Sequence, residues 1–192
     1  PATTLSNYCY KSMFKGCTGI TSVPSNYLPA TTLASGCYSG MFKDCTSLTT
    51  APELPATTLA YECYGSYDTN YPNGMFENCT SLTTAPELPA TTLAQSCYGG
   101  MFKGCTSLTT APVLPATTLT GGCYQQMFSG CTSLTTLPAL NATTLTGGCY
   151  SGMFSGCTSL TTVPSNYLPA TTLADGCYSG MFSGCTSLTT VP

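Results

Sequence analysis

The phrase Cys149-Tyr150-Ser151-Gly152-Met153-Phe154-Ser155-Gly156-Cys157, followed by Thr158-Ser159-Leu160-Thr161-Thr162, decides how this chain folds. It recurs seven times with small changes, and the residues between its copies are spacers. Self-similarity at a fixed period is the sequence signature of a solenoid, in which each unit buries its apolar face by stacking on its neighbours. The sequence therefore predicts a repeat solenoid.

The unit boundaries follow from a second phrase, Pro-Ala-Thr-Thr-Leu, which opens each unit except the one that starts with Asn141. The basic length is 26 residues, and the third unit carries an eight-residue insertion, 65–72. Both ends of the chain fall inside a repeat phrase, so we expect it to be a fragment of a longer array. We predict one solenoid domain, residues 1–192, made of the seven units 1–28, 29–54, 55–88, 89–114, 115–140, 141–168 and 169–192.

The second unit shows which elements to expect. Leu33, Cys37 and Met41 are four residues apart, which predicts the stripe of a short helix. The helix should stop at Asp44, because other units have Gly or Asn there and all three tolerate a left-handed backbone. Residues 48–51 are rich in β-branched side chains and end at proline, which predicts a short parallel strand and then an irregular proline-rich return. The apolar residue at the strand start should enter one continuous core: Ile20, Leu48, Leu82, Leu108, Leu134, Leu160 and Leu188.

Composition excludes several classes of protein. Charged residues make up only 6% of the 192 residues and the net charge is −3, so there is no basic footprint for nucleic acid. No apolar run is long enough to span a membrane. Histidine, the commonest general base and metal ligand, is absent. The sequence therefore predicts no enzyme, no catalytic residue, no metal site and no cofactor.

The fourteen cysteines fall two to a unit. They are either small buried hydrophobic residues or in-repeat disulfides. Residues eight apart on an unbroken helix are separated by about 12 Å, too far to bridge, but a left-handed stop folds the second cysteine back. The third unit keeps both cysteines although its insertion separates them. We therefore predict seven bridges: Cys9–Cys17, Cys37–Cys45, Cys63–Cys79, Cys97–Cys105, Cys123–Cys131, Cys149–Cys157 and Cys177–Cys185.

The stretch Met-Phe-x-Gly-Cys-Thr-Ser-Leu-Thr resembles the repeat of the BspA-like leucine-rich-repeat family, and is most similar to bacterial surface proteins with Met-Phe-x-Gly-Cys-Ser-Ser-Leu. The resemblance covers all seven units. It implies one parallel strand per repeat, a short helix or turn opposite, a cell-surface or secreted setting, and a role in adhesion. Two features depart from the family pattern: the first cysteine of each pair, and the proline that interrupts the strand.

Three surface features are candidates for binding. Paired threonines recur after the core leucine, and a stacked array of this kind resembles those of ice-binding proteins, although threonine also suits a solvent-facing strand. A tyrosine follows each first cysteine, and we expect a packing ladder rather than a carbohydrate platform. The insertion carries Tyr67, Asp68, Asn70 and Tyr71, the composition of an adaptable recognition loop, although an exposed turn also tolerates such an insertion without any role in binding.

These observations favour a non-enzymatic, disulfide-braced scaffold for adhesion or recognition, outside the cell or on its surface. Its partners would be a protein or a glycan at a surface, or further copies of itself end to end. They would not be nucleic acid or a membrane that this segment enters. The alternative is a segment of an extracellular fibre or of a phage appendage, and a more distant one is ice binding.

Overall fold

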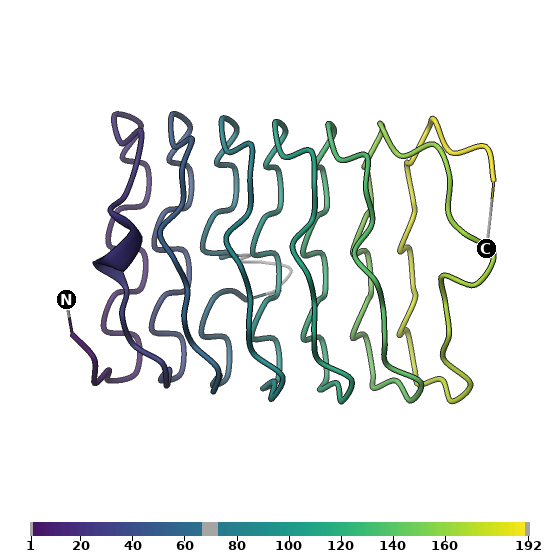
Figure 1. The fold of residues 1–192 in the computed structure, drawn as a ribbon, viewed down its shortest axis with the longest axis horizontal. Coiled ribbons are helices and arrows are strands. Elements are labelled where there is room, and N and C mark those ends of the chain that lie inside the picture. Colours follow the sequence, from purple (N-terminus) through teal and green to yellow (C-terminus); the bar gives the residue numbers. More distant parts are fainter. Residues whose placement is uncertain (1, 67–72, 191–192) are drawn as a thin grey trace.

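A computed structural model describes residues 2–66 and 73–190 as an elongated stack of similar coils, with residue numbers rising along the long axis (Figure 1). In these two ranges the only helix is the 3₁₀ helix η1 (Ser25–Tyr27). The rest consists of turns, irregular segments and isolated parallel β-bridges. The predicted solenoid is therefore present, but its coils are built almost without regular elements.

The segment predicted to be a helix is a ribbon of consecutive turns. In the second unit the amides of Cys37, Met41 and Cys45 each donate to the carbonyl three residues earlier, at 3.1–3.3 Å. The backbone takes a positive φ every fourth residue, at Gly36 (58°), Gly40 (63°) and Asp44 (62°). A helix cannot contain such residues, because its hydrogen bonds require a negative φ throughout. The stripe spaced by four residues therefore reports a four-residue turn period, and the predicted helix is wrong.

The left-handed residue before each second cysteine was predicted correctly. Its φ lies between 60° and 75° in every unit: Gly16, Asp44, Asn78, Gly104, Gly130, Gly156 and Gly184. In every unit except the third, the same conformation recurs four and eight residues earlier, which was not predicted from the sequence. It ends one turn of a ribbon and does not cap a helix.

In this turn ribbon, amides that donate to a carbonyl of their own coil alternate with amides that donate to a carbonyl of the next coil. While Cys37 and Met41 donate within their own coil, the amides of Tyr38 and Phe42 donate to the next coil, each at 2.9 Å, to the carbonyls of Cys63 and Met75. The same alternation recurs in later units, for example from Tyr124 to Cys149 at 3.0 Å. Neighbouring coils are thus joined by main-chain hydrogen bonds without a β-sheet.

The predicted strands are reduced to single bridges. Parallel bridges join Ser22 to Thr50, Thr50 to Thr84, Thr84 to Thr110 and Thr110 to Thr136, one residue per coil. A second row links Thr32, Thr58 and Thr92, and a further bridge links Thr144 and Thr172. The proline two residues beyond the first row lacks an amide hydrogen and stops the pairing. The expected strand of three or four residues is therefore wrong, although the parallel direction is correct.

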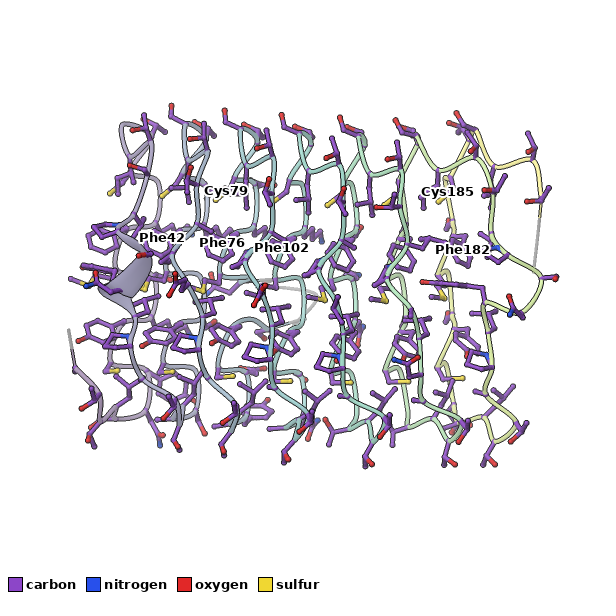
Figure 2. The ribbon with its side chains drawn as sticks, in the orientation of Figure 1. Phe42, Phe76, Cys79, Phe102, Phe182 and Cys185 are labelled. Carbon is purple, nitrogen blue, oxygen red and sulfur yellow. The ribbon has the colours of Figure 1, made fainter. Side chains whose placement is uncertain are left out.

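The core is a set of parallel columns. The predicted leucine column is confirmed, because Leu48, Leu82, Leu108, Leu134 and Leu160 are fully buried and Ile20 and Leu188 are partly buried at the two ends. Phenylalanines stack beside it with ring centroids 5.5–5.7 Å apart and planes within 12° of parallel. Figure 2 shows Phe42, Phe76 and Phe102 in one row along the stack. Repetition of one contact in every coil gives the stack its straight, regular form.

Candidate functional site

Two adjoining hollows lie on the returns between the threonine row and the next Pro-Ala-Thr-Thr-Leu phrase. One, of about 420 Å³, lies between residues 51–55 and Pro86, Glu87 and Pro89. Its neighbour, also about 420 Å³, lies between residues 85–89 and Pro112, Val113 and Pro115. The two hollows share the return of residues 86–89. We call the surface formed by residues 52–55, 86–89 and 112–115 the return face.

Each return on this face has the pattern Pro-x-Leu-Pro, and its chemistry explains the hollows. Leu54, Leu88 and Leu114 are buried and anchor the segment to the core. The residue x points outward, and Val113 is 77% exposed. Proline has no amide hydrogen, so it cannot bind the return of the next coil as an ordinary strand would. Shallow gaps lined by proline rings are left between neighbouring returns.

The charge on the return face is negative. Glu53 and Glu87 are exposed at equivalent positions of successive coils, and both line the same hollow. The four lysines, Lys11, Lys15, Lys43 and Lys103, all lie in the turn ribbons instead. Lys43 forms an ion pair with Glu77 at 2.9 Å, and Lys103 donates to the side-chain oxygen of Gln126 at 2.9 Å. The carboxylates of Glu53 and Glu87 therefore lie on a different part of the coil from the lysines.

This surface was not predicted from the sequence, which indicated only irregular proline-rich returns. The signal was the recurrence of proline at a spacing of three residues in three consecutive units, around a leucine that has to be buried. That pattern indicates a return that is both extended and anchored.

The cysteines form two columns, one for each position in the unit. In the second column, from Cys45 onward, the thiol of each residue donates to the carbonyl of a phenylalanine in the preceding coil at 3.1 Å, as from Cys45 to Phe14 and from Cys131 to Phe102. Cys79, Cys105, Cys157 and Cys185 do the same. The thiols are hydrogen-bond donors in the seam between coils.

All fourteen cysteines are free thiols in the structure: residues 9, 17, 37, 45, 63, 79, 97, 105, 123, 131, 149, 157, 177 and 185. The seven in-repeat bridges stay a prediction. The main-chain amide of each cysteine closes its own turn, as from Cys37 to Ala34 and from Cys45 to Phe42. Besides desolvation, the charge of Cys9 in the neighbouring coil raises the pKa of Cys37. The charge of Cys17 raises the pKa of Cys45 in the same way.

Burial makes most of these thiols poor nucleophiles. Desolvation raises the pKa of Cys37, Cys123 and Cys157 from 9.0 to about 12. It also raises the pKa of Cys105, which is fully buried. Because the thiolate is the reactive species, a raised pKa and the lack of access both suppress chemistry at these positions.

The tyrosines form the packing ladder that the sequence predicted. Their centroids are 5.5–6.0 Å apart from Tyr10 through Tyr38, Tyr64, Tyr98, Tyr124 and Tyr150 to Tyr178. The central five are almost wholly buried, so they cannot form a platform for sugars. They pack between turn ribbons, however, and not between helices.

The threonine rows hold coils together. The hydroxyls of Thr49, Thr135 and Thr189 donate to the carbonyls of Thr21, Thr109 and Thr161 at 3.0–3.3 Å. These hydroxyls face the neighbouring coil, which favours the structural role of the array over the ice-binding one.

Main-chain hydrogen bonds join the described residues on the two sides of the insertion. Met75 donates to the carbonyl of Tyr64 at 2.7 Å, as Met41 does to Tyr38 in the unit before, and Asn73 donates to Ser66 at 3.2 Å. The side chain of Asn73 donates to the hydroxyl of Ser39 at 3.2 Å. The candidate loop residues Tyr67, Asp68, Asn70 and Tyr71 lie outside the described residues, so their part in binding stays a prediction.

Within 2–66 and 73–190, no three His, Cys, Asp or Glu side chains gather as metal ligands would. In the same ranges, no helix has the length and apolar character needed to cross a membrane.

The stacked coils, the buried leucine column and the parallel bridges define a solenoid of the leucine-rich-repeat class. A family model described as "BspA type Leucine rich repeat region (6 copies)" matches residues 5–134 and 69–189, and the chain belongs to this family. Searches of curated proteins and of solved structures gave no match.

Proposed function

We propose that this chain is a non-enzymatic scaffold, on a cell surface or outside the cell, that presents its return face for adhesion or recognition. The observation that supports this most is the pair of adjoining hollows across three consecutive returns. A solenoid repeats its surface at every coil, and such proteins use these extended surfaces for binding. The family supports the location, because BspA-type repeats are typical of bacterial surface proteins.

The location can be tested on the cells that make the protein. An antibody against the folded chain should label intact cells or their culture medium, and external protease should remove the cell-bound signal. Labelling that appears only after the cells are permeabilised would contradict the proposal. A cytoplasmic protein of the same cells, probed in parallel, controls for leakage.

A second candidate is a segment of an extracellular fibre. It is favoured by the main-chain ladder between turn ribbons, whose donors point from each coil to the next along the stack. A ladder of one polarity can continue from one copy to another. Sedimentation velocity over a wide range of concentration tests this, because a fibre segment should form longer particles as concentration rises, while an isolated scaffold should keep one sedimentation coefficient.

A further inference from the structure

We infer that the return face docks a protein segment that carries both basic and aromatic side chains, by presenting three parallel Pro-x-Leu-Pro segments to it. This inference rests on the proposed function and specifies its partner. Four features of the return face support it: the shape of the returns, their rigidity, their charge and the exposed valine.

The first step is the motif. Pro52-Glu53-Leu54-Pro55, Pro86-Glu87-Leu88-Pro89 and Pro112-Val113-Leu114-Pro115 each place two prolines three residues apart. Segments with this spacing dock on aromatic-lined surfaces, because a proline-rich extended chain is already ordered and its rings pack on aromatic faces. The complementary partner of a proline-lined hollow is therefore an aromatic side chain.

The second step is preorganisation. A free proline-rich peptide is tethered at neither end, whereas here the leucine of each return is only 3–4% exposed and fixes the segment to the core. The Glu53 amide also donates to the carbonyl of Ser25 in the preceding coil at 3.0 Å. Rigid presentation lowers the entropy cost of binding. Each hollow is shallow and measures about 420 Å³, so an aromatic side chain would lie against its proline rings.

The third step is charge. Glu53 and Glu87 line one hollow together with four prolines, Pro52, Pro55, Pro86 and Pro89. The lysines of the chain lie on the turn ribbons, and Lys43 and Lys103 already contact Glu77 and Gln126. A partner with arginine or lysine beside its aromatic residue would be attracted to these carboxylates, and an acidic partner would be repelled.

The fourth step is the neighbouring hollow, which Glu87 also lines and where Val113 takes the place of the second glutamate. This side chain is 77% exposed, the highest value among the exposed large hydrophobic residues. The return face therefore changes from acidic to apolar over three coils. A segment lying across it would place its basic residues over Glu53 and Glu87 and an apolar or aromatic residue over Val113.

The test uses the folded chain and a blocked peptide of alternating arginine and tryptophan, six residues long, as the probe. Titration followed by amide NMR should show saturable shifts at Glu53, Glu87, Leu88 and Val113. Replacing tryptophan by alanine in the probe should weaken binding about tenfold, since the ring contacts are lost. Replacing arginine by glutamate should abolish binding.

Two protein variants separate this site from general charge attraction. The double variant Glu53→Gln and Glu87→Gln should weaken binding about fivefold, as expected for two exposed ion pairs. The control Asp44→Asn and Asp175→Asn changes net charge by the same amount away from the return face and should leave affinity within about twofold. Asn is tolerated at the first control position, because Asn78 occupies it in the next unit with a similar φ of 60°.

The inference is overturned if the shifts fall on the turn ribbons, if the probe does not bind, or if both double variants weaken binding equally. Failure of this test would leave the proposed surface location standing, because antibody labelling of intact cells does not depend on the probe. Conversely, probe binding by a protein found inside the cell would retain the docking surface and remove the proposed function.

Discussion

Among single residues, the cysteines show how much the surroundings decide chemistry. The same side chain that closes disulfides in many extracellular proteins serves here as a weak donor to a phenylalanine carbonyl across the seam, at 3.1 Å in each coil from Cys45 to Cys185. A small, polarisable thiol fits a closely packed column where a larger side chain would not.

We expect a thiol-alkylating reagent to distinguish the ends of the cysteine columns from their middle. In the native 192-residue chain without reductant, Cys9 and Cys17 should be labelled, because both are exposed, and Cys97 and Cys131 should not, because both are fully buried. After denaturation, still without reductant, all fourteen should be labelled. Peptide mass analysis measures each site.

The same experiment addresses the disulfides predicted from spacing. If the bridges form in the protein as it is made, denaturation without reductant will leave cysteines unlabelled and lower the peptide masses by two hydrogens per bridge. That outcome would contradict the free-thiol arrangement of the structure.

At the level of local elements, the turn ribbon depends on its left-handed positions. Gly130 has a φ of 75°, and a methyl group added there would meet its nearest neighbours at 3.7 Å, an ordinary contact. Substitution by alanine should therefore isolate the backbone cost and lower the free energy of unfolding by about 1–2 kcal/mol. Substitution by asparagine should cost less, because asparagine enters this region more readily. Thermal or urea unfolding measures both.

Gly121 is the matched control. It lies in the same unit, its φ is not positive, and an added methyl group would also find its nearest atom at 3.7 Å. Alanine there should be neutral, or stabilising by about 0.4–1 kcal/mol through the unfolded chain. Equal losses at the two positions would show that the left-handed conformation is not what Gly130 supplies.

The turn ribbon also shows how much of this fold can be predicted from the sequence. The spacing of Cys37, Met41 and Cys45 fixes which side chains are buried, and the burial was predicted correctly. The same spacing is compatible with a 3.6-residue helix over such a short stretch, so periodicity alone could not reveal the turns. The discriminating signal was the glycine at Gly36 and Gly40, which weakens a helix but suits a turn at every fourth residue. The docking surface needed a further fact, the outward direction of Val113, which only the stack provides.

For the whole molecule, the buried columns make stability depend on pH. The thiols of Cys37, Cys123 and Cys157 have a pKa of 9.0 without burial and of about 12 in the fold. Between these values the unfolded chain loses protons that the folded chain keeps. Stability is therefore full below pH 9 and falls as pH rises toward 12, by about 1.4 kcal/mol per pH unit for each such thiol.

Melting curves in a reducing buffer, followed by the near-ultraviolet dichroism of the tyrosines, should show a melting temperature that is constant near neutral pH and declines steeply above pH 9. Burial raises the pKa of Tyr38 and Tyr64 as well, so their ionisation adds to the decline at higher pH. A melting temperature that does not change between about pH 8 and pH 11 would contradict the buried thiol columns.

The alternating amides have a mechanical consequence. Because half of the ladder bonds run from coil to coil, along the long axis (Figure 1), a force applied to the two ends pulls directly against them. Coils detach from an end in turn, since each touches only its neighbours. Equivalent residues of successive coils are 26 positions apart in the regular part of the stack, so one detached coil releases up to about 90 Å of chain. Stretched between two anchors, the protein would lengthen in steps of similar size, and each step would lower the force between the anchors.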